Sequence, residues 1–366
     1  MVDIYGTLGP KCSDKDTLVQ MFDAGMTGVR LNLSHITLHH AADQIETLHC
    51  AAACCGKKAQ LLIDMQGPEL RIGTLASPLT LKEGEEILLG EKGVPVPDDI
   101  FPELSPGQQL LLDDGKILAE VISHSRENVY ARVIRGGILR SRKSIALPGT
   151  ALHPPTMTDV DRENISIASQ YGVTAVMQPF VRDRQDLETV RAALNTSGAS
   201  SIRLFAKIEN TEGVHNLDDL IPACDEIVIA RGDLGNAMPL WELPRVQKVI
   251  SERCRRAQKP FMVVTQMLAS MEHNAVPTRA EVSDIFNAVC DGAASVMVTG
   301  ETAIGNYPVE VIRYLANTVR EAEKYRSELE SYKCTNPAGK SLPGQTVDKV
   351  PIESAFALPM GTLSTV

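Results

Sequence analysis

Short apolar runs recur along the chain, and most of them are followed by a segment with helical periodicity. Eight such runs begin at Ile4, Gly28, Ala59, Thr174, Arg203, Glu226, Phe261 and Ala294. Helical patterns lie between them, for example over residues 14–24, 39–53 and 243–257. Strands that alternate with helices predict βαβ units and a parallel sheet, and eight units predict a closed (β/α)8 TIM barrel, an α/β fold, rather than an open sheet.

The pattern changes between Asp64 and about Thr156, where apolar and polar residues alternate and Gly and Pro punctuate the chain. This alternation predicts a small all-β domain inserted after the third strand, at the barrel end where active sites lie, so we expect a lid. After about Tyr325 the periodicity fades, and we expect a loop or a short strand and helix. The predicted domains are 1–70 (barrel), 71–153 (insertion), 154–325 (barrel) and 326–366 (tail).

Composition narrows the class of protein. The 366 residues are 43% hydrophobic and 22% charged, which is typical of a globular chain with a large core. Aromatic residues make up 4%, so we expect an aliphatic core. The net charge of −10, without clustered cations, argues against nucleic acid as a partner. The chain has no apolar run long enough for a membrane span, no signal-peptide pattern and no disulfide-like cysteine spacing, so we expect a cytoplasmic protein.

Polar residues stand at the carboxyl ends of the predicted barrel strands. Such residues are costly to bury unless they are paired or bind a metal, and in this fold they converge at one mouth. The segment RGDLG, followed by an amphipathic helix, could offer backbone N–H groups to an anion. The strand-end residues are Arg30, Asn32, Ser34, Asp64, Lys207, Glu209, Arg231, Asp233, Thr265, Thr299 and Glu301.

The residue types at the mouth suggest a chemistry. Glu209 and Asp233 follow adjacent strands and are hard oxygen ligands suited to Mg²⁺ or Mn²⁺. Lys207 lies two residues before Glu209 and therefore points to the same side of its strand, where it can stabilise developing negative charge. Arg30 and Arg71 add donors for phosphate or carboxylate. The residues alone predict metal-assisted chemistry on a small phosphorylated or carboxylated anion.

Several motifs, in order, resemble those of the pyruvate kinase family, and the resemblance extends over residues 4–325. The segments DDG at Asp113 and SRKSIALPG at Ser141 look like parts of that family's lid domain. The motifs are GTLGPKC, AGMTGVRLNLSH, LLIDMQGPELRIG, AKIENTEGVHNLDDL, IVIARGDLG, KPFMVVTQMLASM and PTRAEVSDIFNAVCDGAASVMVTGETAIGNYPVE.

The resemblance implies transfer of a phosphoryl group from phosphoenolpyruvate to ADP, followed by protonation of the enolate to pyruvate. Lys207 would stabilise the transition state, Arg30 would contact the phosphoryl group and Thr265 would lie near the path of the proton. Glu209 and Asp233 would hold Mg²⁺ or Mn²⁺. The phosphoenolpyruvate site would be lined by Arg30, Gly232, Asp233 and Thr265.

The resemblance also implies a nucleotide site and a monovalent-cation site. The nucleotide residues would be Arg71, Lys143, Asn32 and His35. The ligands of K⁺ would be Asn32, Ser34 and Asp64. Glu69 resembles the potassium-requiring relatives, whereas Met65, Gln66 and Ile72 resemble those that use a lysine instead. We expect K⁺ because it would balance the added carboxylate.

The chain departs from the family pattern at the edge of the site and at its end. Pro179 replaces a serine and Ile304 replaces a lysine of the family pattern. The tail shows no pattern of the family's C-terminal α/β domain, so we do not expect regulation through that domain. Besides a kinase, two alternatives stay open: a binding or regulatory protein with weakened catalysis, and a Mg²⁺-dependent lyase or aldolase acting through a pyruvate enolate. The implied partners are phosphoenolpyruvate, pyruvate and ADP or ATP, and a homo-oligomer also stays open.

Overall fold

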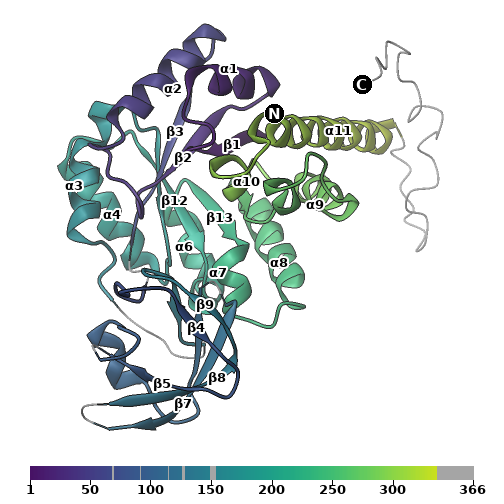
Figure 1. The fold of residues 1–366 in the computed structure, drawn as a ribbon. Helices are drawn as coiled ribbons and strands as arrows, with labels where there is room; N and C mark the ends of the chain where they lie inside the picture. Colours follow the sequence, from purple (N-terminus) through teal and green to yellow (C-terminus); the bar gives the residue numbers. More distant parts are fainter. Residues whose placement is uncertain (68–69, 91, 114, 126–127, 149–153, 336–366) are drawn as a thin grey trace. The chain divides into compact units, whose positions relative to one another are not determined.

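The computed structural model describes residues 1–67, 70–90, 92–113, 115–125, 128–148 and 154–335. Eight parallel strands close into a barrel in the order β1-β15-β14-β13-β12-β11-β3-β2, as predicted (Figure 1). Each corresponds to one of the eight apolar runs in the sequence. The barrel strands are β1 Asp3–Thr7, β2 Gly28–Asn32, β3 Gln60–Asp64, β11 Ala175–Gln178, β12 Arg203–Ile208, β13 Glu226–Ala230, β14 Phe261–Val264 and β15 Ser295–Met297.

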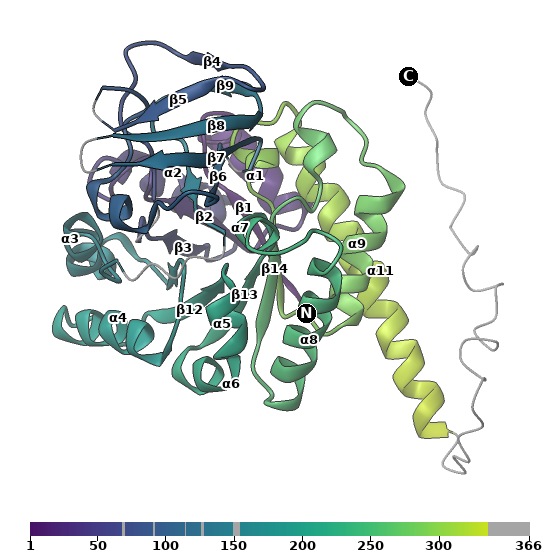
Figure 2. The ribbon, with the colours of Figure 1, turned by 90° about the horizontal axis from the view of Figure 1, so that it is seen from below.

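Helices follow the strands and surround the barrel (Figures 1 and 2). The helices are α1 Lys15–Ala24, α2 Ala42–Cys54, α3 Asp159–Ile167, α4 Arg184–Thr196, α5 Thr211–His215, α6 Leu217–Leu220, α7 Arg231–Asn236, α8 Leu243–Arg256, α9 Arg279–Cys290, α10 Gly300–Ala303 and α11 Pro308–Thr335. Short 3-10 helices are η1 Asp98–Glu103, η2 Ala168–Tyr171, η3 Ile221–Ala223 and η4 Ala269–Glu272.

Some helix ends differ from the predicted ranges. Helix α1 begins directly after Asp14, whose side chain accepts a hydrogen bond from Thr17 N at 2.9 Å. Helix α2 begins at Ala42, later than predicted, because the preceding residues form a separate turn in which Thr37 Oγ1 lies 2.8 Å from His40 Nδ1. Helix α11 continues past Tyr325 to Thr335, where the pattern predicted less regular structure.

Two apolar layers pack on opposite sides of the barrel wall. The layer between strands and helices is mainly aliphatic, as expected, and includes Val29, Ile63 and Ile229. The layer inside the barrel departs from the aliphatic expectation, because methionines and two aromatic rings fill much of it. Unbranched Met side chains adapt to an irregular interior that branched residues fill less readily. The inward-facing residues are Tyr5, Leu62, Ala175, Met177, Phe205, Val228, Ala230, Met262, Val264 and Met297.

The segment inserted between β3 and β11 forms two antiparallel sheets with a core of their own, including Leu110, Ile117 and Val133. One sheet has the order β10-β6-β7-β8-β5 and the other pairs β4 with β9 (Figure 2). The fold class is therefore as predicted. The strands are β4 Leu79–Leu81, β5 Glu86–Leu89, β6 Gln109–Leu112, β7 Ile117–His124, β8 Val129–Arg135, β9 Gly137–Leu139 and β10 Ile145–Ala146.

A polar network lines the amino-terminal end of the barrel, opposite the predicted mouth. Tyr5 Oη donates to Gln60 Oε1 at 2.5 Å, and Arg203 Nη2 donates to the same oxygen at 2.7 Å. Glu226, which is 4% exposed, accepts from Ser295 Oγ and lies 3.9 Å from Arg203 Nη1. Burial raises the pKa of Glu226 to about 7, against smaller opposing effects of Ser295 and Arg203.

The chain divides into two compact units, Met1–Glu323 and Lys324–Val366. The first contains the barrel and the inserted β segment, and the described part of the second is the end of α11. The boundaries that we predicted at residues 70, 153 and 325 stay predictions. Over the described ranges, no helix is both long enough and apolar enough to cross a membrane.

Candidate active site

The inward-facing side chains at the carboxyl end of the barrel are polar. Alternation along each strand places Arg30 and Asn32 of β2 inside the barrel, because they pair with Leu62 and Asp64 of β3. Lys207 of β12 follows the inward-facing Phe205 by two residues and therefore points the same way. The apolar interior thus ends in a layer of charged groups, which defines the mouth of the barrel.

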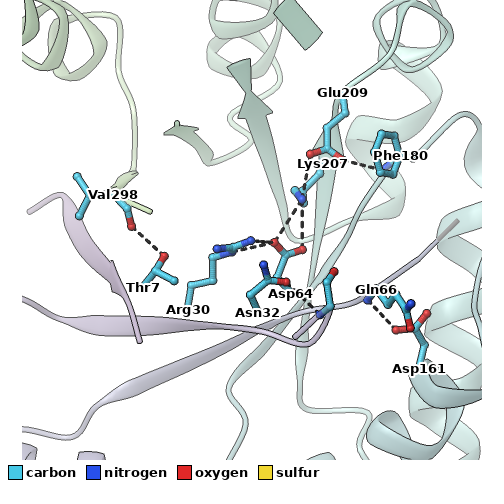
Figure 3. A network of polar contacts seen from close by, with 11 residues as sticks. Thr7, Arg30, Asn32, Asp64, Gln66, Asp161, Phe180, Lys207, Glu209 and Val298 are labelled. Carbon is cyan, nitrogen blue, oxygen red and sulfur yellow. Dashed lines mark hydrogen bonds and ion pairs between the residues drawn. The ribbon is translucent and has the colours of Figure 1, made fainter. Parts of the chain in front are cut away.

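Four of these groups form one ion-pair network (Figure 3). Lys207 Nζ lies 2.9 Å from Glu209 Oε1 and 3.3 Å from Asp64 Oδ1, so it bridges two strands. On the other side of Asp64, Arg30 Nη2 and Nε contact Oδ2 at 2.6 and 2.8 Å. Asp64 and Glu209 are 2% and 3% exposed, so these carboxylates need their cations in order to stay charged.

The network keeps Asp64 and Lys207 ionised despite their burial. Burial acts to raise the pKa of Asp64, but the charges of Lys207 and Arg30 outweigh it and hold that pKa below its usual value. Burial acts to lower the pKa of Lys207, yet Asp64 and Glu209 more than compensate and raise it. Lys207 is therefore an ammonium ion fixed in position at the mouth, which suits it to stabilise negative charge on a reacting group.

Glu209 is held by a second strand end as well. Its Oε2 accepts a hydrogen bond from the backbone N–H of Phe180 at 2.9 Å, immediately after β11 (Figure 3). Phe180 adopts a positive φ of 51°, which is uncommon for a residue other than glycine. Pro179, the departure from the family's serine, precedes it. The substitution therefore lies beside a predicted metal ligand.

The two residues that were predicted to bind a divalent cation follow adjacent strands of the barrel. Asp233 is half-buried in the first turn of α7, which follows β13, while Glu209 follows the adjacent β12. No cluster of three or more His, Cys, Asp or Glu side chains suited to a metal occurs among the residues the structure describes. A pair of hard carboxylates that leaves other positions to water and substrate oxygens is typical of Mg²⁺ sites.

The segment RGDLG forms the short helix α7. The amphipathic helix that was predicted after it, α8, begins at Leu243, as expected. Within α7, Gly232 lies against Thr265, since a Cβ added to Gly232 would be 3.6 Å from the Thr265 methyl group. The structure thus brings together two of the predicted phosphoenolpyruvate residues, which come from neighbouring strands.

The predicted K⁺ residues make contacts within the chain. Asn32 Oδ1 accepts from Ser34 N at 3.1 Å in a local turn. Asp64, as described above, pairs with Arg30 and Lys207. Glu69, on which the expectation of K⁺ depends, lies outside the described residues. Ile304, the second departure from the family pattern, is the exposed C-terminal cap of α10.

The predicted nucleotide residues of the inserted segment lie together. Arg71 Nη1 donates to Arg142 O at 2.8 Å, and Lys143 Nζ pairs with Asp113 Oδ1 at 2.7 Å. The pKa of His35 is lowered, first by desolvation and then by the positive charges of Arg71, Arg30 and Lys143. A neutral imidazole beside several cations marks a positively charged region suited to phosphates.

Asp161 of α3 holds a segment of the mouth in place, although no sequence motif marked it as a candidate. Its carboxylate accepts from the backbone N–H groups of Gln66 and Gly67 at 2.8 and 3.0 Å, directly after β3 (Figure 3). It also accepts from Thr158 in a capping box. The spacing Thr-x-x-Asp was visible in the sequence, but it indicates only a helix start. Its second role depends on two segments distant in the chain.

Comparisons with known proteins agree with this geometry. A family model described as pyruvate kinase, barrel domain, matches residues 1–312. A pyruvate kinase of Geobacillus stearothermophilus is 37% identical over 332 residues, which cover 88% of this chain and 57% of that protein. One of Bacillus licheniformis is 34% identical over 359 residues, covering 93% and 61%. One of Aeropyrum pernix is 36% identical over 326 residues, covering 88% and 71%. The chain thus spans about three fifths of the two bacterial relatives.

Proposed function

The chain belongs to the pyruvate kinase family, and from this premise we propose that it transfers the phosphoryl group of phosphoenolpyruvate to ADP and yields pyruvate and ATP. The observation that carries the proposal is the buried ion-pair network, in which Lys207 is held 2.9 Å from Glu209 at the barrel mouth. A fixed ammonium at that place can neutralise charge that develops on a transferring phosphoryl group.

Each side chain at the mouth then has a role in the proposed reaction. Arg30 binds the phosphoryl oxygens and Lys207 stabilises their charge in the transition state. Thr265 lies on the path by which the enolate is protonated, and Gly232 leaves room for the substrate beside it. Ion pairs with Asp64 hold the side chains of Arg30 and Lys207, which supports a reaction with little reorganisation of these two groups.

Glu209 and Asp233 would hold Mg²⁺ or Mn²⁺ in this proposal. When bound, the ion supplies positive charge that orients the substrate and neutralises its oxygens. Arg71, Lys143, Asn32 and His35 would contact the phosphates of the nucleotide. A K⁺ ion, with Asn32, Ser34 and Asp64 as ligands, completes the proposed set of cofactors.

The test is formation of pyruvate from phosphoenolpyruvate and ADP by the 366-residue chain, with Mg²⁺ and either K⁺ or Na⁺. We expect pyruvate to form only when ADP and Mg²⁺ are both present, and faster with K⁺ than with Na⁺. If no pyruvate forms with either monovalent cation, the proposed reaction is wrong. Equal rates with K⁺ and Na⁺ would overturn only the potassium site.

Replacement of the central lysine tests the mechanism. We expect Lys207→Ala to lower kcat by about 10² or more, because a group that stabilises developing charge acts mainly in the transition state. Lys207→Arg keeps a positive charge between the two carboxylates and serves as the variant that retains the fold. Lys248→Ala removes an exposed lysine paired with Asp291 and should change nothing. Unchanged turnover in Lys207→Ala would refute the assigned role.

A further inference from the structure

Thr265 stands in a backbone conformation that a β-branched residue rarely adopts. Its φ is +74°, and that of Gln266, the next residue, is +54°. Both follow directly after β14, so the chain turns sharply at the mouth of the barrel. Non-glycine residues at positive φ persist only where surrounding contacts fix them. A contact with a neighbouring residue must therefore hold Thr265 in this conformation.

Arg231 supplies that contact. Its Nη2 and Nε donate to the backbone oxygen of Thr265 at 2.7 and 3.2 Å. Its Nη1 pairs with Asp284 Oδ2 of α9 at 2.6 Å, and Nη2 also lies 2.9 Å from Met267 Sδ. The Arg231 side chain is 11% exposed, so these bonds form away from bulk water. One guanidinium thus joins α7, the turn after β14, and α9.

The position of Arg231 in the chain links the contact to the site. Arg231 is the first residue of α7 and directly precedes Gly232 and Asp233, which belong to the proposed substrate and metal sites. Thr265 Oγ1 donates to Val264 O at 2.6 Å, so the direction of this hydroxyl depends on the local backbone. Fixing the Thr265 carbonyl therefore fixes its side chain relative to the start of α7.

We propose that Arg231, oriented by Asp284, is a positioning residue that holds Thr265 in its strained turn and places the threonine hydroxyl for protonation of the enolate. The inference rests on the proposed function. Arg231 acts through Thr265. A lysine cannot replace it, because the planar fork of the guanidinium serves the carbonyl and the carboxylate at once, whereas an ammonium lacks that geometry.

The experiment compares Arg231→Lys and Asp284→Asn with Arg184→Lys, a matched control. Arg184 pairs with Glu188 on the exposed surface of α4, so its replacement should leave activity unchanged. Four quantities are measured: kcat and KM for phosphoenolpyruvate, the rate at which pyruvate methyl hydrogens exchange with D₂O, followed by NMR, and the midpoint of thermal unfolding. Methyl exchange reports formation and protonation of the enolate without phosphoryl transfer.

We expect Arg231→Lys to lower kcat and methyl exchange by about 10², with KM within about threefold of wild type, since a small displacement of a reacting group is enough for such a loss. Asp284→Asn should lower both by about tenfold. A merely structural role would lower the unfolding midpoint without slowing methyl exchange. Methyl exchange within threefold of wild type in both variants would therefore overturn the proposal. If Arg231→Lys does not fold, Asp284→Asn, at a half-buried position on α9, decides it.

Failure of the proposed function would be recognised separately. In that case the wild-type chain forms no pyruvate. The contact of Arg231 with the Thr265 carbonyl is then tested by amide hydrogen exchange at Gln266 and Met267. Release of the turn in Arg231→Lys should then speed exchange there by at least about tenfold, with no change in Arg184→Lys. Equal exchange in the wild type and Arg231→Lys would show that Arg231 does not hold the turn.

Discussion

Single residues of this barrel are charged or neutral according to the partners that the fold gives them. Asp64 and Glu226 are both buried acids on barrel strands, at opposite ends. Asp64 has two cations within 3.3 Å and a lowered pKa, whereas Glu226 has a serine and one cation at 3.9 Å and a raised one. Similar burial therefore leaves Asp64 charged at the mouth, whereas it raises the pKa of Glu226 at the amino-terminal end of the barrel.

Glu226 predicts a pH dependence of stability. Its folded-state pKa of about 7 lies above the ordinary value of 4.5, so the folded chain holds a proton that the unfolded chain releases between these values. Stability from this group is complete below pH about 4.5 and is lost as pH rises through about 7. Glu226→Gln should remove this dependence and, at pH 8, exceed the wild type in stability by about 1–3 kcal/mol.

Urea unfolding at pH 5 and pH 8 measures the effect. The control is Glu188→Gln, which removes an exposed carboxylate on α4 and should keep the wild-type difference between the two pH values. If the difference in free energy of unfolding between the wild type and Glu226→Gln is the same at pH 5 and pH 8, the raised pKa of Glu226 is wrong.

At the scale of elements, the mouth depends on links between segments that are distant in the chain. The carboxylate of Asp161 caps the first turn of α3. It also accepts hydrogen bonds from the backbone N–H groups of Gln66 and Gly67, directly after β3. Gly67 has a φ of +58° and leaves no room for a side chain, since an added Cβ would lie 2.3 Å from Pro179. Pro179 thus packs against Gly67, in the segment that follows β3. It also directly precedes Phe180, whose backbone N–H donates a hydrogen bond to Glu209.

Asp161→Asn tests this link. The amide retains one acceptor but would turn N–H groups toward backbone donors, so we expect a loss of about 1–3 kcal/mol in stability and faster amide exchange at Gln66 and Gly67. Asp159→Asn, in the same turn of α3 but exposed, is the matched control. If both variants lose stability equally, Asp161 contributes only as an acidic residue at a helix start.

At the scale of the whole molecule, the barrel and the inserted β segment have separate cores. None of the buried residues of the inserted core belongs to the barrel cores. Packing energy is short-ranged, so a cavity made in one core should be felt mainly there. The two parts of the first compact unit can therefore differ in local stability.

Leu110→Ala in β6 tests this separation. Leu110 is 1% exposed, and its truncation should cost about 2–5 kcal/mol, lowering amide protection in β6, β7 and β8. Protection in the barrel strands should stay near that of the wild type. Ile229→Ala in β13 is the reciprocal variant. Loss of protection that spreads evenly over both parts in either variant would show that they unfold as one.

The sequence by itself determined the barrel, because its short apolar runs and the segments of helical period 3.6 between them are local patterns that can be recognised without knowledge of their neighbours. It also placed Arg30, Asp64, Lys207 and Glu209 at one mouth, because parallel strands bring their carboxyl ends together. These expectations needed only strand order and alternation.

Only the tertiary structure decided which charges meet and which backbone is strained. The contact of Asp161 with Gln66, the hold of Arg231 on Thr265 and the raised pKa of Glu226 each depend on segments far apart in the chain. No local pattern encodes them, because hydrogen bonds, ion pairs and desolvation act over a few ångströms in space rather than along the sequence.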